Sequence, residues 1–276
     1  MKNRPMTRVN LDKAIARIAG NDPRLAIGIR MSMANAIVGQ FLPEGVVKGG
    51  TSLKYRFGGD HARYTLDLDA AWKTDLDTFL VNLKKNLSKG WEGFTGEVAV
   101  RPQASPAAIP FDYVMQPCDV KLSYMGRSWC TICLEVGHNE IGDADDAEMI
   151  SVPSDLATLF REMCFPVPNP LPLMKLPFQI AQKLHGATGL RSRRAHDLID
   201  LQLIVNTSKI DLAETRIICE RLFRYRKLQT WPPKVVNQEG WEEIYAMQKL
   251  DLPVLTTVAE AIEWTNQLIS KIDAAR

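Results

Sequence analysis

Apolar residues recur along this chain with two different periods, and the period changes in the second half. Between residues 62 and 72, apolar side chains occupy every second position, which predicts a strand with one apolar face. Shorter runs of similar character predict further strands at 97–101, 119–124 and 129–136. Spacings of three and four residues predict helices after Pro23 and over 75–87.

From residue 176 onward, only the helical spacing recurs. It predicts helices at 176–185, 194–205, 211–226, 240–250 and 257–273. Strands mixed with helices, followed by helices alone, predict an α/β (α+β) fold in which a lobe with a mixed β-sheet precedes an all-α lobe. The character changes at Val152-Pro153, so we expect domains at 1–152 and 153–276.

Composition narrows the function classes only slightly. The 276 residues include 34 Lys and Arg against 32 Asp and Glu, and a net charge of +2 does not by itself predict binding to nucleic acid. The sequence shows neither a signal-peptide pattern nor an apolar run long enough to span a bilayer. We therefore expect a cytoplasmic protein without membrane contact.

The five cysteines fit a reducing compartment, and Cys130-x-x-Cys133 raises the question of a zinc or redox site. Residues three apart on a strand point to opposite faces, and no second pair completes a set of four ligands. We therefore expect buried thiols.

Two carboxylates, Asp67 and Asp69, lie near the end of the predicted strand. At positions i and i+2 their side chains leave the same face, with Cα atoms roughly 6.6 Å apart. Like charges this close raise each other's pKa unless a cation lies between them. Mg²⁺ usually takes one or two carboxylates and completes its shell with phosphate oxygens, so the pair fits a Mg²⁺ site, with Mn²⁺ as second candidate. The alternative is an exposed strand face with two solvated aspartates.

The segment Lys48-Gly49-Gly50-Thr51-Ser52 precedes these carboxylates and suits a phosphate-binding turn. Glycines let the backbone approach phosphate oxygens, and the hydroxyl of Thr51 or Ser52 can donate a hydrogen bond to them. The short helix expected to begin here would direct its N-terminus at the same negative charge. A tight turn between a strand and a helix is the alternative.

A glycine pair followed by Asp-x-Asp on a strand is typical of the DNA-polymerase-β-like nucleotidyltransferase superfamily. Four motifs together resemble the AbiEii family of MenT-like nucleotidyltransferase toxins, from type IV toxin–antitoxin and abortive-infection systems. They are Gly49-Gly50-Thr51, Arg63-Tyr64-Thr65-Leu66-Asp67-Leu68-Asp69, Ala181-Gln182-Lys183-Leu184-His185-Gly186 and Arg194-Ala195-His196-Asp197-Leu198-Ile199-Asp200-Leu201. Gly186 stands where the family commonly has alanine, which we expect to affect helix packing only, and His196 replaces a usual arginine.

The resemblance implies a nucleotide held between the two lobes. Lys183 would place its ammonium on the β- and γ-phosphates as a point charge, with Arg191 as a second cation. Asp197 and Asp200, one helical turn apart, would orient these cations or act as a general base. The alternative for the two aspartates is an ion-pair network between helices.

A third carboxylate at the metal site should come from a neighbouring strand. Glu135 is the first candidate, because it lies among apolar residues where a charge needs a partner. It could also accept the proton of the acceptor. Asp119 is the alternative, and either residue could be a simple charge at a strand edge.

The resemblance implies a toxin that acts as a metal-dependent nucleotidyltransferase with an antitoxin encoded nearby. It would transfer NMP from an NTP to an RNA acceptor, with tRNA 3′ ends favoured, release pyrophosphate and so block translation. One predicted helix gathers basic residues that would attract RNA: Arg216, Arg221, Arg224, Arg226 and Lys227. The alternatives are transfer to a small molecule or protein side chain, and a non-catalytic nucleotide-binding relative.

Overall fold

The computed structural model describes residues 3–63, 65–73, 75–103 and 114–276. Tyr64, one apolar position of the predicted strand 62–72, lies outside these residues. Contacts divide the chain into two compact units. Unit 1 comprises Met1–Gly58 and Thr65–Leu173, and unit 2 comprises Gly59–Tyr64 and Met174–Arg276.

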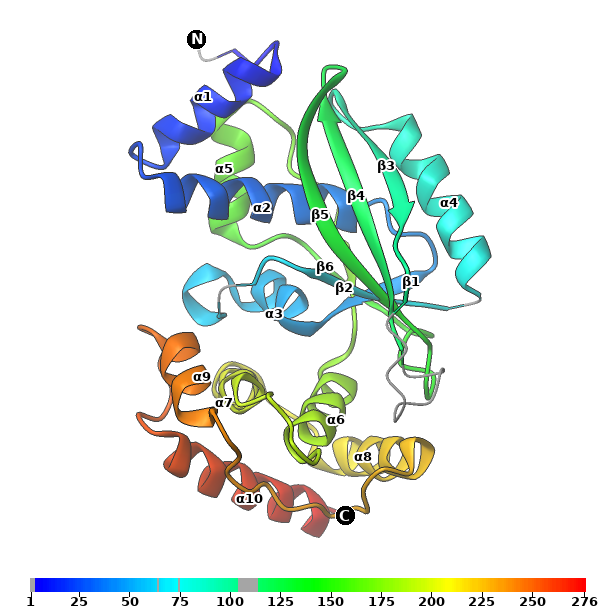
Figure 1. Ribbon diagram of the computed structural model, residues 1–276, viewed down its shortest axis with the longest axis vertical. Helices are drawn as coiled ribbons and strands as arrows, with labels where there is room; N and C mark the ends of the chain where they lie inside the picture. The colour runs from blue at the N-terminus through cyan, green and yellow to red at the C-terminus, as the bar shows by residue number, and fades with distance from the viewer. Residues whose placement is uncertain (1–2, 64, 74, 104–113) are drawn as a thin grey trace. The chain divides into compact units, whose positions relative to one another are not determined.

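A mixed sheet forms the centre of unit 1, and its strands are drawn as arrows in Figure 1. In the described residues it has seven strands in the order β3-β4-β5-β2-β1-β7-β6. They are β1 (Gly45–Lys48), β2 (Leu68–Trp72), β3 (Phe94–Val100), β4 (Gln116–Tyr124), β5 (Arg127–Gly137), β6 (Glu148–Ile150) and β7 (Leu171–Leu173). The pairs β2–β5 and β1–β7 are parallel, and the others are antiparallel. The mixed sheet confirms the predicted fold class.

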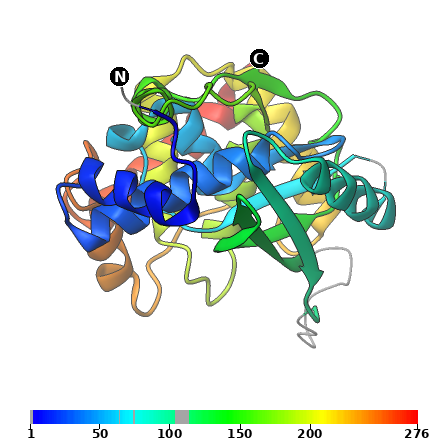
Figure 2. The ribbon, with the colours of Figure 1, turned by 90° about the horizontal axis from the view of Figure 1, so that it is seen from above.

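Unit 1 also contains helices, most of which contact the sheet. They are α1 (Arg8–Ile18), α2 (Pro23–Gly39), α3 (Gly49–Phe57), α4 (Leu76–Lys89) and α5 (Ser154–Glu162). Helix α4 lies beside β3, while α1 and α2 contact β5, as Figure 2 shows from above. Helix α5 contacts α2, and β7 pairs with β1. These contacts place residues 153–173 in unit 1, so the division differs from the predicted boundary at residue 152.

Strand β2 is shorter than the strand predicted over 62–72. Side chains from elsewhere in unit 1 bind the backbone just before it. Asn35 Nδ2 donates to Leu66 O at 3.2 Å, and Thr51 Oγ1 donates to Asp67 O at 2.6 Å. The prediction was wrong upstream of β2, because apolar alternation does not reveal acceptors that distant side chains occupy.

Unit 2 is helical, as the sequence predicts. Its helices are α6 (Leu176–Ala187), α7 (His196–Thr207), α8 (Leu212–Arg226), α9 (Trp241–Lys249) and α10 (Val258–Ala274). Helix α6 packs on α7 and α8, and α10 contacts α7, α8 and α9. Trp241 is fully buried, and its Nε1 donates to Ser192 O at 2.6 Å. This bond fixes the loop between α6 and α7.

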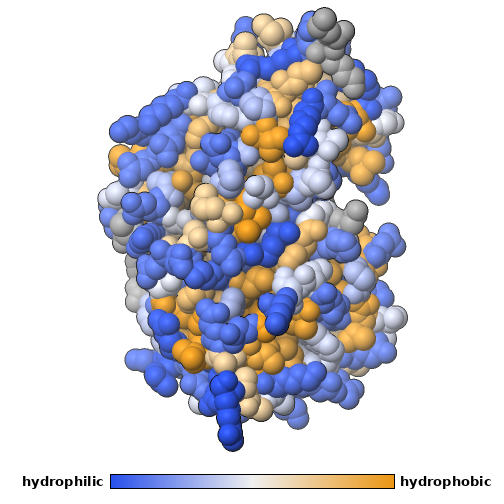
Figure 3. All heavy atoms as spheres, turned by 180° about the vertical axis from the view of Figure 1, so that it is seen from behind, coloured by the Kyte–Doolittle hydropathy of each residue, from blue (hydrophilic) through white to orange (hydrophobic). Residues whose placement is uncertain are grey.

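No helix in the described part of the chain is long and apolar enough to cross a membrane. On the face shown in Figure 3, hydrophilic side chains separate the apolar areas. Exposed large apolar side chains are spread over several elements, for example Val81 on α4, Ile217 on α8 and Met247 on α9.

Candidate functional site

Three charged side chains form a row across neighbouring strands of unit 1. Asp69 on β2 is the register partner of Glu135 on β5 and of Lys48 on β1. Register partners in a sheet project to the same face, so the row gathers two carboxylates and one ammonium. Asp67 lies one residue before β2, and its charge also acts on Glu135. The fold thus places Asp69 beside Glu135, with Asp67 near enough for its charge to act on Glu135.

Gly49 brings the beginning of α3 against the Asp69 carboxylate. Its φ of 67° lies in the left-handed region, and an ideal Cβ at this position would lie 2.0 Å from Asp69 Oδ2. Glycine satisfies both conditions, so the glycine motif and the Asp-x-Asp motif are in direct contact. The partial positive charge of a helix N-terminus also favours a carboxylate there.

Gly50, Thr51 and Ser52 are buried in the first turn of α3. The Thr51 hydroxyl donates to the carbonyl oxygen of Asp67 at 2.6 Å. In this structure Thr51 therefore positions the residue that precedes β2. Phosphate binding by Gly49, Gly50, Thr51 and Ser52 stays a prediction.

Glu135 lies where negative charge is concentrated. Burial raises the pKa of Glu135, and the charges of Asp69 and Asp67 raise it further. Lys48 acts in the opposite direction but does not cancel the shift. Burial also raises the pKa of Cys133, which lies two residues before Glu135 on β5 and is affected by the same carboxylates.

Asp119, the alternative third carboxylate, has a different setting. It lies on β4 opposite Cys133 and forms an ion pair with Arg101 at 3.3 Å. Glu135, in contrast, is the direct register partner of Asp69. Among the described residues, no group of three or more His, Cys, Asp or Glu side chains is arranged to hold a metal ion.

The pair Cys130 and Cys133 on β5 carries free thiols. Both residues are half-buried, so the expectation of buried thiols holds only in part. Burial raises the pKa of Cys130 to about 12. The thiolate, which is the form that binds metals and attacks disulfides, is therefore scarce at neutral pH.

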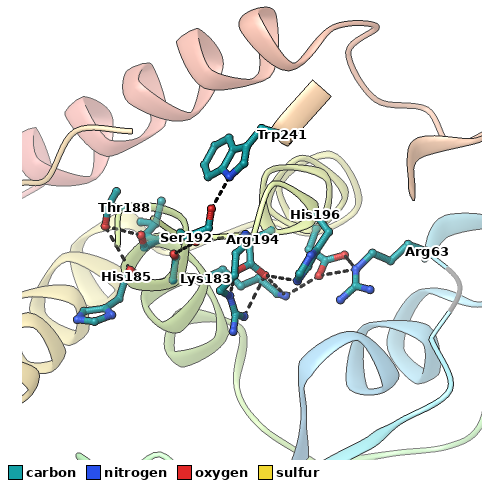
Figure 4. A network of polar contacts seen from close by, with 12 residues as sticks. Arg63, Lys183, His185, Thr188, Ser192, Arg194, His196 and Trp241 are labelled. Carbon is teal, nitrogen blue, oxygen red and sulfur yellow. Dashed lines mark hydrogen bonds and ion pairs between the residues drawn. The ribbon is translucent and has the colours of Figure 1, made fainter. Parts of the chain in front are cut away.

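A buried network of charges surrounds Lys183 in unit 2 (Figure 4). Lys183 Nζ lies 2.5 Å from Asp200 Oδ2 and 3.2 Å from Asp197 Oδ1. Lys183 is on α6, and the two aspartates are one turn apart on α7, which packs against α6. None of the three side chains is more than 5% exposed, so each charge depends on its partners.

Two arginines complete the network. Arg63 Nε lies 3.0 Å from Asp200 Oδ1 and 3.1 Å from Oδ2. Arg194 Nε lies 2.5 Å from Asp197 Oδ2, and its Nη2 lies 3.3 Å from Oδ1. Three cations therefore contact the two carboxylates: Lys183 and Arg63 are buried or nearly so, and the Arg194 side chain is 51% exposed.

Neighbouring side chains set the protonation states in this network. Burial by itself would raise the pKa of Asp197, but the charges of Arg194 and Lys183 outweigh burial and hold that pKa well below its usual range. Burial lowers the pKa of His196 to about 4 and that of His185 to about 3. Both histidines are thus neutral at pH 7 and do not add to the positive charge.

Gly186 affects more than helix packing, contrary to the expectation from the sequence. An ideal Cβ there would lie 2.5 Å from Arg194 Nε and 3.0 Å from Asp197 Oδ2. Glycine on α6 therefore leaves the space that Arg194 uses to reach α7. Arg191, predicted as the second cation on the triphosphate, is exposed in the loop between α6 and α7 and is not part of this network.

Sequence reasoning assigns no individual role to two cations that the structure places in these clusters, Lys48 and Arg63, and it does not predict the contact of Arg194 with Asp197. Lys48 directly precedes the glycine pair. Arg63 and Arg194 each begin one of the four matched motifs. Their position inside a motif is the signal that could have identified them.

Comparison with known proteins finds one matching family. A family model described as "Nucleotidyl transferase AbiEii toxin, Type IV TA system" matches residues 34–265. None of the curated proteins matches this chain. The four motifs on which the resemblance was based all lie inside the matched range.

Comparison with solved structures finds three matches to report. MenT4, a nucleotidyltransferase toxin from Mycobacterium tuberculosis, is 17% identical with a TM-score of 0.54 over 95% of this chain and 98% of that chain. A putative nucleotidyltransferase from H. pylori is 14% identical with a TM-score of 0.47, over 89% and 93% of the two chains. A nucleotidyltransferase-like protein from Paracoccidioides brasiliensis is 16% identical with a TM-score of 0.41, over 72% and 89%. At 17% identity, the similarity to MenT4 shows a shared fold and nothing more.

Proposed function

Because the chain belongs to the AbiEii family of nucleotidyl transferase toxins from type IV toxin–antitoxin systems, we propose that it transfers NMP from an NTP to an RNA acceptor. Transfer to the 3′ end of tRNA would block translation, and a cognate antitoxin encoded nearby would be its partner. The row of Glu135, Asp69 and Lys48 beside the N-terminus of α3 is the observation that carries the proposal.

The carboxylates of Asp67, Asp69 and Glu135 fit a Mg²⁺ ion by their chemistry. Mg²⁺ prefers oxygen ligands and usually takes one or two protein carboxylates, with phosphate oxygens and water completing its shell. Burial and, after it, the charges of Asp69 and Asp67 raise the pKa of Glu135, and a cation would relieve the repulsion between these carboxylates. When bound, Mg²⁺ or Mn²⁺ would neutralise charge on the phosphates.

In the proposed reaction, the acceptor hydroxyl oxygen bonds to the α-phosphorus of the NTP. The bond from that phosphorus to the bridging oxygen breaks, and pyrophosphate leaves. The hydroxyl proton passes to a carboxylate, and Glu135, the register partner of Asp69, is the candidate acceptor. The N-terminus of α3 would attract phosphate oxygens. The protein thus acts mainly by positioning and charge neutralisation.

In unit 2, two neighbouring cations support binding of phosphate. Lys183 would supply one charge, while Asp197 and Asp200 hold its ammonium in place. Arg63, whose Nε binds Asp200, adds a guanidinium beside that ammonium. Two cations held close together favour an anionic ligand.

Helix α8 supports an RNA acceptor. Arg224 and Lys227 are exposed and line a cavity of about 910 Å³ together with Trp231. Arg216, another basic residue of this helix, is paired with Glu220 at 2.9 Å. Exposed cations attract phosphate groups, and an aromatic ring can stack on a base.

Transfer is tested by supplying the protein with each α-labelled NTP and Mg²⁺, together with total tRNA, a protein mixture or small alcohols. We expect label in tRNA, pyrophosphate in equal amount, and no transfer when EDTA chelates the metal. Label in protein or small alcohols alone would replace RNA as the acceptor class. Absence of label from all three would overturn the proposed activity.

The carboxylate row is tested with Asp69→Asn. This change removes one negative charge at the row and should lower transfer by about a hundred-fold or more. Asp77→Asn is the matched control, because Asp77 is exposed in the first turn of α4. Equal transfer by Asp69→Asn and Asp77→Asn would remove the row from the mechanism.

A further inference from the structure

Asp200 holds two cations on one buried carboxylate. Arg63 Nε lies 3.0 and 3.1 Å from its two oxygens, and Lys183 Nζ lies 2.5 Å from Oδ2. The Asp200 side chain is 1% exposed, so water screens these charges weakly. The guanidinium and the ammonium are therefore held close together despite their mutual repulsion.

The way in which Arg63 binds Asp200 leaves most of its guanidinium donors unused. Nε makes both contacts with Asp200, and among the described residues the two η nitrogens have no hydrogen-bond partner. The Arg63 side chain is 15% exposed, so these donors lie near solvent. Figure 4 shows Arg63 reaching the network from one side, with its terminal nitrogens directed away from it.

The chemistry of this arrangement selects an anion with several oxygens. A guanidinium presents its donors in a planar fork that matches two phosphate oxygens, whereas an ammonium acts as a point charge. Asp200 binds one cation of each kind, Arg63 and Lys183. A polyphosphate would satisfy the unused donors of Arg63 and bring negative charge to both cations.

We propose that Arg63 and Lys183 together bind the polyphosphate chain of the NTP, with Asp200 holding both cations in place. Arg63 thereby takes the role that sequence reasoning gives to Arg191. The inference rests on the proposed function, since the NTP is the substrate there. Polyphosphate binding can nevertheless be measured without any nucleotide transfer. An experiment can therefore refute the polyphosphate site without refuting the proposed function, and the reverse.

Arg63→Lys is the informative variant, because it keeps a positive charge beside Asp200 and removes the fork. Calorimetric titration of the full-length protein with ATP and with inorganic tripolyphosphate, without acceptor, measures the binding. We expect Arg63→Lys to bind both about ten-fold or more weakly, as for loss of a hydrogen bond to a charged group. Arg193→Lys, at an exposed position outside the network, should bind like the parent.

Thermal unfolding separates lost binding from a folding defect. At one concentration, tripolyphosphate should raise the Tm of the parent and of Arg193→Lys equally, and that of Arg63→Lys by less. If Arg63→Lys does not fold, protection of Arg63 in the parent from phenylglyoxal by tripolyphosphate, read by mass spectrometry against Arg193, decides the question.

The assignment of Arg63 would be overturned if Arg63→Lys and the parent bound tripolyphosphate with equal affinity. It would also be overturned if the parent did not bind tripolyphosphate, or if tripolyphosphate did not protect Arg63 from phenylglyoxal. Binding that depends on Arg63 without any nucleotide transfer would instead refute the proposed function and leave the polyphosphate site standing.

Discussion

Gly186 and Arg194 fit together without room for a β-carbon: an ideal Cβ at Gly186 would lie 2.5 Å from Arg194 Nε. Replacing a helical glycine by alanine ordinarily stabilises a protein by about 1 kcal/mol. Here we expect the opposite sign. Gly186→Ala should lower the free energy of unfolding by about 1–2 kcal/mol, because Arg194 must leave the buried carboxylate of Asp197.

A double-mutant cycle isolates this contact. Once Arg194→Ala has removed the guanidinium, adding Gly186→Ala should be neutral or stabilising. Urea denaturation of the parent, the two single variants and the double variant measures the coupling. An equal loss of stability in both backgrounds would show that Arg194 is not the cause.

Gly49 makes a comparable contact with Asp69 in unit 1. Gly49→Ala should cost about 1–2 kcal/mol for the positive φ alone, and it should also abolish transfer, because the new Cβ would displace the Asp69 carboxylate. Gly58→Ala is the control: its φ is 85°, but its ideal Cβ lies 3.9 Å from the nearest side chain, Pro153. Denaturation and the transfer assay together distinguish strain from displacement, and an active Gly49→Ala enzyme would contradict the expectation.

Local patterns predicted most helices because caps and apolar spacing are local properties. Asp211, for example, caps α8 as expected, and its carboxylate accepts from the amides of Ala213 and Glu214. Helix α5 and strand β7 were not predicted in this way, because they depend on packing against α2 and pairing with β1. Because the sequence analysis did not predict α5 and β7, it set the domain boundary at residue 152, before these two elements.

The residues of the candidate site were predictable from the sequence only where their arrangement depends on local spacing. Asp197 and Asp200 share a helix face by their spacing, so their convergence on Lys183 follows once α6 and α7 pack together. Arg63 and Asp200 are 137 residues apart in sequence. Their ion pair depends on the segment Gly59–Tyr64 belonging to unit 2, and no local pattern contains that information.

Two histidines with lowered pKa values, the buried His185 and the half-buried His196, should make the protein less stable in mild acid. Burial holds the folded pKa of His196 at about 4 and that of His185 at about 3, below the ordinary histidine value of 6.5. As pH falls below 6.5, His185 and His196 become protonated in the unfolded chain but stay neutral in the folded chain. Stability is therefore greatest above pH 6.5 and decreases by up to about 1.4 kcal/mol per pH unit for each histidine until its folded pKa is reached.

Urea denaturation between pH 7 and pH 4.5 measures this decrease. His196→Gln should reduce the slope, because glutamine does not titrate. Protonated His185 would also lose its acceptor nitrogen opposite Arg226 Nη1, which lies 3.2 Å from His185 Nδ1. An unchanged slope in His196→Gln would show that His196 titrates normally in the folded protein.

The basic end of α8 should govern affinity for RNA if RNA is the acceptor. Replacing Arg224 and Lys227 together by glutamine removes two exposed cations from the cavity that Trp231 also lines. We expect kcat/KM for tRNA to fall about ten-fold and KM for the NTP to stay unchanged. For two lost contacts to single-stranded RNA, the slope of log affinity against log salt should decrease by roughly 1.4.

A matched double variant controls for net charge. Lys209 and Lys234 are exposed lysines that do not line this cavity, and their replacement by glutamine removes the same two charges. Fluorescence anisotropy of labelled tRNA at several salt concentrations compares the two proteins. The two double variants carry equal net charge. If both lose the same affinity for tRNA, the attraction is a general effect of charge. If only the Arg224 and Lys227 variant loses affinity, the RNA contacts that end of α8.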